Sequence, residues 1–531
     1  MKSLSMNRRL VCLSPGVVAF FVAALVSVWV PAYPNIHDDF GNLLVADTLL
    51  HGRLSNPTPP SHELLQSFHI VVEPSYAAKF PIGSGALMAF GKLVFGEWKV
   101  GMWLAASLAC SAITWMLLAA LPARWAWTFG MMSALHPMWQ TGWSQEFTHG
   151  WLAVGSVALV IGGLLRLRRI GVGHGRSASI AVAIGLVLGM FSRPFEVALL
   201  SGLLALPFAY EWIRNGRLGS RAFWLAGSPA ALILMLGFTM QGFVNQQVTG
   251  SWYQLPYQLH EKQYGVAPVF VWQIPHEPSL GHRFPEQVAF HRGWSMEAYE
   301  SAASWSGYGR LMGTRALHLV KHWGWLLALA PVAAVAIRRV RFRYWGVWFA
   351  AVAAFLVINA IPWVSPNYVA PLIPLAILLS AVGIRAALHA MAHSSADESG
   401  KVFTHRGRLD RVVMIGLLLS QVVGLVVCTR SMVEARNSDP LPWFVERAQT
   451  EAHLLAQEGN HLVMVRYAPG HNIHHEWVFN AADPTTARIV WARWDESLAD
   501  ELQSDYPNRS VWLLEVSSDD SHRLLPWEPR T

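Results

Sequence analysis

The sequence predicts an all-α polytopic membrane protein of about eleven transmembrane helices, with a small α/β domain at its C-terminal end. Hydrophobic residues make up 53% of the 531 residues, charged residues only 14%, and there are 26 tryptophans. Apolar stretches of spanning length recur throughout residues 1–430, whereas residues 431–531 alternate in the manner of strands. So little charge cannot cover the surface of a soluble chain of this length, which excludes a soluble multidomain protein.

Separate apolar windows account for the membrane part. They are residues 14–31, 99–120, 125–141, 149–165, 178–192, 196–213, 222–243, 317–337, 344–362, 367–389 and 411–428. Residues 84–96 form a shorter, glycine-containing stretch, for which we expect an interfacial or re-entrant helix. The first window follows Arg8 and Arg9 and lacks a small-residue cleavage site, which indicates an uncleaved anchor.

Basic clusters predict the side of the membrane on which each loop lies. They are Lys2/Arg8/Arg9, Arg124, Arg166/Arg168/Arg169/Arg176, Arg214/Arg217/Arg221, Arg338/Arg339/Arg341/Arg343 and Lys401/Arg406/Arg408/Arg411. With this set of helices every cluster falls on one face, and the opposite loops 142–148 and 363–366 contain no lysine or arginine. We therefore expect a multi-pass membrane protein with a cytoplasmic N-terminus and an outer C-terminus, which in a bacterial inner membrane is periplasmic. The net charge of +7 then requires no nucleic-acid partner.

The periplasmic side is predicted to carry most of the polar chain. It holds the first outer loop 32–98, the turns 142–148 and 192–196, the large outer loop 244–316 and the α/β domain 431–531. In that domain we expect strands at 461–467, 488–492 and 510–515, and helices at 442–458 and 496–506. The cysteines, Cys12, Cys110 and Cys428, lie in or beside apolar stretches, so no disulfide framework is expected.

Two adjacent acids, Asp38 and Asp39, open the first outer loop directly after the first apolar window. Carboxylates at a membrane border are costly unless they are solvated, paired or used. A carboxylate can take the proton of an incoming hydroxyl or amine while a phosphate leaves the anomeric carbon of a sugar, so these two are the candidate catalytic residues. The alternative is helix capping, because an aspartate before Phe40 can accept N–H bonds at a helix start. Adjacent side chains diverge, so we expect only one of them to face a substrate.

Further polar residues of the same face are candidates for binding substrate. They are Lys79, Arg193, Glu196, Glu146, Arg53, Tyr257 and His260. The planar fork of Arg193 suits a phosphate or pyrophosphate, and the alternative is an ion pair with Glu196 or a snorkelling anchor. Lys79 is likewise either a phosphate contact or a residue of an ion pair or membrane anchor. Lys79 and Arg53 lie in the same loop as the two aspartates and could pair with them.

The remaining candidates have weaker signals. Glu146 lies near His149, where an acid–base or metal role competes with an ordinary interfacial position. Tyr257 and His260 belong to a tyrosine-rich segment that either stacks on a sugar or prenyl chain or forms part of the aromatic belt of a membrane protein.

Cofactor signals are sparse. A divalent metal ion is left open, because the two aspartates and Glu146 could supply ligands although their spacing does not require one. His471, His474, His475 and Glu476 resemble metal ligands, but no second ligand pair follows, which argues against zinc. No Walker-type glycine loop or dinucleotide fingerprint occurs. A sugar donor used outside the membrane would then be carried by a lipid, because nucleotide sugars are cytoplasmic.

Short motifs along the whole chain carry a family resemblance. They are Asp38-Asp39-Phe40, Ala46-Asp47-Thr48, Gly52-Arg53, Asn56-Pro57, Pro74-Ser75-Tyr76, Lys79-Phe80-Pro81, Ser192-Arg193-Pro194-Phe195-Glu196, Arg466-Tyr467 and Glu476-Trp477-Val478. Together they resemble the GT-C superfamily of polyprenyl-phosphate-dependent glycosyltransferases, near its bacterial protein-mannosyltransferase-like members (glycosyltransferase family 39) and the rhizobial core glycosyltransferases. Asp39 replaces a frequent Glu and Ile82 a usual Pro, and residues 142–150 lack the family's Tyr-Trp and Gly-Gly turn, so the sugar is not determined.

The resemblance implies an inverting, GT-C-type transfer of a hexosyl or pentosyl unit. The donor would be a polyprenyl-phosphate-linked sugar and the acceptor an unidentified glycan, lipid or protein of the envelope. Asp38 would be the general base with Asp39 in support, and Arg193 and Lys79 would hold the phosphate. A transporter or flippase of lipid-linked saccharides and a non-catalytic envelope-assembly scaffold are the alternatives. A transporter usually carries charges within its spans, so the nearly charge-free spans favour the enzyme.

Overall fold

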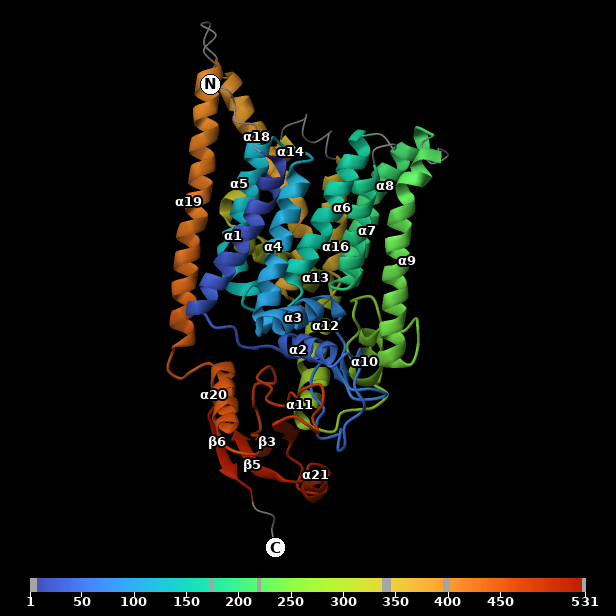
Figure 1. Cartoon of the computed structure of the whole chain (residues 1–531), viewed down its shortest axis with the longest axis vertical. Coiled ribbons are helices and arrows are strands. Elements are labelled where there is room, and N and C mark those ends of the chain that lie inside the picture. The colour runs from blue at the N-terminus through green and yellow to red at the C-terminus, as the bar shows by residue number, and fades with distance from the viewer. Residues whose placement is uncertain (1–6, 171–174, 217–220, 337–344, 395–401, 528–531) are drawn as a thin grey trace.

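The computed structural model describes residues 7–170, 175–216, 221–336, 345–394 and 402–527. Three layers follow one another along its longest axis: a helical bundle, a layer of short helices and loops, and a small α/β domain (Figure 1). The bundle is the membrane part, and the other two layers lie at one of its ends.

The helices of the bundle are close to those predicted. They are α1 (Arg8–Trp29), α4 (Trp98–Leu117), α5 (Ala123–Ala134), α6 (Gly150–Ile170), α7 (Arg176–Met190), α8 (Pro194–Arg214), α9 (Arg221–Thr249), α13 (Trp305–Trp323), α14 (Trp325–Ala336), α16 (Trp345–Ile358), α17 (Pro366–Val369), α18 (Ile373–Ser394) and α19 (Val402–Arg436). Among the described residues, 7 helices are long and apolar enough to cross a membrane. The chain is thus a multi-pass membrane protein, and the count of about eleven spans stays a prediction.

Two predicted spans are interrupted. The window 317–337 is broken at Gly324, whose φ of 74° and ψ of 154° cannot continue a helix and separate α13 from α14. The window 125–141 ends as an α-helix at Ala134, because Pro137 follows and has no N–H to donate. The chain then resumes in a π-helix, η1 (Trp139–Trp143).

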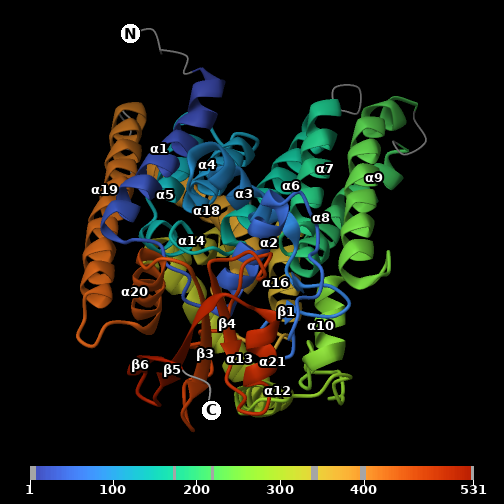
Figure 2. The same cartoon turned by 60° about the horizontal axis from the view of Figure 1, so that its bottom comes forward.

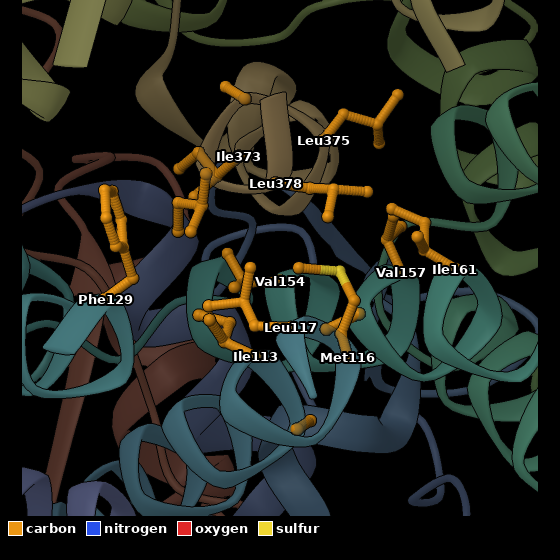
Figure 3. Packing of buried hydrophobic residues seen from close by; sticks show 14 of the residues in the cluster. Ile113, Met116, Leu117, Phe129, Val154, Val157, Ile161, Ile373, Leu375 and Leu378 are labelled. Atoms are coloured by element: carbon orange, nitrogen blue, oxygen red, sulfur yellow. The ribbon is translucent and has the colours of Figure 1, made fainter. Parts of the chain in front are cut away.

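The core of the bundle lies where α4, α6 and α18 meet. Ile113, Met116 and Leu117 of α4 face Val154, Val157 and Ile161 of α6, with Ile373 and Leu378 of α18 above them (Figure 3). Small side chains such as Ala105, Ala109 and Ala112 also line α4. They allow close contact between helices, as is usual in membrane bundles.

Basic helix ends gather at the end of the bundle away from the α/β domain (Figures 1 and 2). Arg8, Arg9 and Arg166 line one cavity where α1, α4 and α6 meet. Arg124 Nη2 lies 2.6 Å from Asp410 Oδ2. The clustering is as predicted, but which face is cytoplasmic stays a prediction. Lys2, Arg217, Arg338, Arg339, Arg341, Arg343 and Lys401 lie outside the described residues.

Short elements form the layer next to the bundle. They are α2 (His37–Leu50), the hairpin β1 (Ile70–Val71) and β2 (Ala77–Ala78), α3 (Ile82–Phe95), α10 (Pro256–Tyr264), α11 (Pro285–Val288), the π-helix η4 (Ala289–Trp294) and α12 (Ser295–Ala303). Both long outer loops therefore contain helices. Asp38 and Asp39 lie in the first turn of α2, where negative side chains complement the helix dipole.

The α/β domain contains a sheet of strand order β4-β3-β5-β6. β3 (Asn460–Tyr467) pairs in parallel with β4 (Ile489–Arg493) and β5 (Arg509–Val516), and β6 (His522–Pro526) pairs antiparallel with β5. The domain's helices are α20 (Trp443–Ala456) and α21 (Ala499–Asp505). The three predicted strands and two predicted helices are present, and β6 was not predicted.

The α/β domain packs directly on the layer of short helices and loops. Phe479 stacks on Phe40 of α2 with ring centroids 4.1 Å apart. The amide of Ala482 donates to Asp47 of α2 at 2.7 Å, and the amide of Arg493 donates to the carbonyl of Leu64 at 2.8 Å. The carboxyl end of β4 thus faces the first outer loop, and the domain forms a cover over α2.

Candidate active site

The two adjacent acids of α2 point in different directions. Asp39 is fully buried, and its two oxygens accept from the amides of Phe147, at 2.8 Å, and Asn35, at 3.1 Å. It therefore ties the start of α2 to the turn 142–148. This is a structural role other than the helix capping weighed above, because the start of α2 has no side-chain cap hydrogen bond. Asp38 is left as the acid that faces other side chains.

Asp38 lies among basic groups. Its Oδ1 is 3.6 Å from Nε2 of His69, and the positive charges of Arg193 and Lys79 act on it. Burial raises the pKa of Asp38 above its usual range, and those two charges limit the rise. A carboxylate with a raised pKa is a stronger base, so the surroundings of Asp38 suit proton abstraction.

Lys79 is anchored by α10. Its Nζ lies 3.0 Å from Oε1 of Glu261 and 4.6 Å from the centre of the Tyr257 ring. The same Glu261 oxygen is 3.3 Å from Nδ1 of His260. Burial and then the charge of Lys79 lower the pKa of His260 to about 4, so this ring is neutral at pH 7. The predicted residues Lys79, Tyr257 and His260 therefore do lie together.

Arg193 keeps hydrogen-bonding capacity. It precedes α8, its Nη1 is 3.5 Å from Oε1 of Glu196, and its guanidinium lies 4.7 Å from the Tyr368 ring centre. Its Nε is buried and has no hydrogen-bond partner among the described residues. A guanidinium held this loosely can still bind an anion.

Glu146 and His149 border the same site. Burial raises the pKa of Glu146 to about 7, although the charge of Arg436 at the end of α19 opposes the shift. His149 is held by Ser84, whose Oγ is 2.8 Å from Nδ1. Burial lowers the pKa of His149 to about 3, so it is a neutral group.

Two π-helices, η1 and η4, border this region. π-Helices are rare in proteins as a whole, and those that occur are often at functional sites. η1 leads into the turn that holds Asp39. η4 places Phe290 5.5 Å from the ring of His37 and 5.8 Å from that of His69. His474 of the α/β domain lies 5.7 Å from His37, so every layer outside the bundle contributes to the wall.

Some site residues differ from the prediction. Arg53 could have paired with the two aspartates, but it does not reach them, because it lies beyond the C-terminal end of α2, at an exposed position about 20 Å along the helix from Asp38. His69, Tyr368 and Arg436 were not among the predicted site residues, and His474 was considered only as a metal ligand. Only His69 had a usable signal, as a histidine between apolar residues of the first outer loop.

The groups weighed as metal ligands do not form a metal site. In the described part of the chain, no three or more His, Cys, Asp and Glu side chains have the arrangement for a metal ion. His475 Nδ1 is 2.8 Å from both oxygens of Asp520, and Glu476 pairs with Arg493.

Comparisons with known proteins identify the fold. No protein-family model and no curated protein matches this sequence. Among solved structures, ArnT from Cupriavidus metallidurans in the apo state is 13% identical, with 94% of this chain and 92% of ArnT covered and a TM-score of 0.53. The structure of that ArnT bound to undecaprenyl phosphate gives 14% identity, the same coverage and a TM-score of 0.53.

Archaeal oligosaccharyltransferase AglB from Archaeoglobus fulgidus is 12% identical, with 96% of this chain and 70% of AglB covered and a TM-score of 0.48. The match to ArnT extends over nearly all of both chains. This chain therefore has the fold of ArnT.

Proposed function

We propose that this protein is an integral membrane glycosyltransferase that moves a sugar from a polyprenyl-phosphate donor to an envelope acceptor at its periplasmic face. The observation that carries the proposal is the position of Asp38. This half-buried carboxylate faces two cations and a histidine at the outer end of a bundle that has the ArnT fold. The undecaprenyl phosphate bound to ArnT supports the choice of donor.

The chemistry is a single displacement at the anomeric carbon. Asp38 takes the proton of the acceptor hydroxyl, whose oxygen forms a bond to that carbon. The bond from the carbon to the donor phosphate breaks, and polyprenyl phosphate leaves with the electron pair. Direct attack inverts the anomeric configuration of the hexosyl or pentosyl unit.

Arg193 is the main ligand of the donor phosphate in this proposal. Its free Nε and its long 3.5 Å contact with Glu196 leave it available. Lys79 adds positive charge but is already paired with Glu261, so it contributes less than Arg193 to binding the phosphate. Glu196 orients Arg193, while Tyr257 and His260 shape the side of the site formed by α10. Glu146 lines the opposite side, and no step requires a metal ion.

The test measures release of polyprenyl phosphate from radiolabelled polyprenyl-phosphate sugars by the purified full-length protein, with envelope extract as the source of acceptor. Because Asp38→Asn removes the general base, we expect it to lower turnover by about 10²- to 10⁴-fold. Glu97→Gln is the matched control, because Glu97 is an exposed carboxylate between α3 and α4.

The outcomes separate the alternatives. Turnover that is lost in Asp38→Asn but kept in Glu97→Gln supports both the donor class and the base. Turnover that survives in Asp38→Asn keeps the enzyme but removes Asp38 as its base. No turnover by the wild type with any donor would favour the transporter or the scaffold.

A further inference from the structure

His69 is the nearest ionisable neighbour of Asp38, and the displacement described above gives it no role. Its Nε2 lies 3.6 Å from Asp38 Oδ1. Its Nδ1 is buried and has no hydrogen-bond partner in the described part of the chain. A buried imidazole without hydrogen bonds is unfavourable, so the position of this ring calls for a reason other than stability.

The backbone conformation of His69 also indicates a functional position. Its φ of 67° places it in the left-handed region, which is unfavourable for a residue other than glycine. The hairpin imposes this conformation, because the amide of Lys79 donates to the carbonyl of His69 at 3.0 Å and β1 begins at the next residue. Backbone strain of this kind is concentrated at functional sites.

The charges around His69 determine its protonation. It is faced by Asp38 and His37 of α2, Lys79 after β2, His260 of α10 and His291 of η4. Burial, and then Lys79, hold the pKa of His69 well below its usual range, so the ring is neutral and can accept a proton. Burial also raises the pKa of Asp38, which brings the proton affinities of the two groups closer together.

We propose that His69 is a positioning residue that acts through Asp38: it orients the carboxylate and then receives, on Nε2, the proton that Asp38 has taken from the acceptor hydroxyl. The inference rests on the proposed glycosyl transfer and deepens it. The proton moves from the acceptor oxygen to Asp38 Oδ1 and then to His69 Nε2. Asp38 thus returns to its charged form while the imidazolium forms beside it and compensates its charge.

The test uses a substitution that the backbone favours. His69→Gly removes the ring at a position whose φ suits glycine, so relief of backbone strain offsets part of the cost of the lost ring contacts with Phe80 and Phe290. In the polyprenyl-phosphate release assay we expect its turnover to fall by about 10- to 100-fold. Added imidazole should restore part of the rate, in proportion to the neutral imidazole present at each pH.

Two further variants fix the interpretation. His69→Gln can donate a hydrogen bond to Asp38 but cannot accept a proton, so its turnover should stay as low as that of His69→Gly. His62→Ala is the matched control, because His62 belongs to the same loop and pairs with Glu73, 3.1 Å away, rather than with Asp38. Its turnover should equal that of the wild type.

Full turnover in His69→Gly or His69→Gln would overturn the proposal, and so would a His69→Gly variant that imidazole does not rescue. Each of these results leaves the glycosyltransferase standing, because the wild type turns over in the same assay. Absence of turnover in the wild type overturns the proposed function itself and this inference with it.

Discussion

Two buried clusters of charge lie close together in this molecule, and they differ in how completely they are paired. One surrounds Asp38 between α2, α8 and α10. The other surrounds Arg493 at the junction between the α/β domain and the first outer loop. Both are built from arginine and carboxylate, so composition does not distinguish them.

The Arg493 cluster is complete. Its guanidinium donates to the carbonyl of Gln66 at 3.0 Å, to Glu286 at 3.2 Å and to Glu476. Glu476 also accepts from the hydroxyl of Tyr467 and from the amide of Val478. No polar atom of Arg493 or Glu476 is left without a hydrogen bond, so this cluster joins two parts of the chain and offers nothing to a ligand.

The Asp38 cluster is incomplete. Arg193 Nε and His69 Nδ1 are buried without a hydrogen-bond partner in the described residues. Polar groups left unpaired inside a protein are rare, and a bound ligand is one reason to keep them. A structural charge cluster and a candidate site therefore differ in whether every buried polar atom has a hydrogen-bond partner.

Breaking the complete cluster should have the largest effect on stability. Arg493→Ala leaves Glu476 and Glu286 without their buried cation, which costs about 3–5 kcal/mol. Proteolysis of the full-length protein between α19 and α20 should become at least about 100-fold faster, because cleavage follows the population of the open form. Arg466→Ala is the control, since its exposed pair with Glu515 contributes about 0–1 kcal/mol. Equal cleavage rates in the two variants would contradict this prediction.

Altering the incomplete cluster should change donor binding with little change in stability. Arg193→Lys keeps the charge beside Glu196 but loses the planar fork that suits a phosphate, so we expect the KM for the donor to rise by about 10-fold. A titration of polyprenyl-phosphate sugar in the release assay measures it. Arg53→Lys, in the exposed turn that follows α2, should leave the KM unchanged. An unaltered KM in Arg193→Lys would remove Arg193 from the phosphate site.

The smallest effect concerns pH. Because the pKa of Glu146 is raised to about 7 in the folded state, from about 4.3 in an unfolded chain, folding favours its protonated form. Its contribution to stability is complete below about pH 4 and declines as the pH rises through 7. Glu146→Gln should flatten the fall of the Tm between pH 4 and 8. A wild-type Tm that does not fall over this range would show that Glu146 is solvated and not buried.

The outer face of the fold was predictable because charge and hydropathy act locally. The apolar windows and the basic clusters together predicted that Asp38, Lys79, Glu146 and Arg193 lie on the outer face. The structure brings these four residues together. Arg53 was misplaced because α2 was treated as a loop. Two acids in a row before an apolar stretch are a helix-start signal, and that signal would have predicted where Arg53 lies.

The remaining site residues depend on contacts between distant segments. His69 reaches Asp38 only through a left-handed turn held by β1 and β2, and no residue type in the sequence marks that turn. His474 reaches His37 only because the α/β domain docks on α2. Such positions are set by tertiary packing, which local patterns do not encode.

The long helix α19 has a mechanical consequence. It stands at the edge of the bundle (Figure 1), and only 11% of its apolar window Leu409–Arg436 is buried. That window of 28 residues is about 42 Å long, against a hydrocarbon thickness of about 30 Å. Its last residue, Arg436, is fixed to the carbonyl of Pro31 beside the site. The other end of the window is held as well, because Asp410 pairs with Arg124 of α5. Hydrophobic mismatch therefore has to be taken up by the surrounding lipid or by tilt of α19 together with the bundle, and Arg436 keeps its place beside the candidate site.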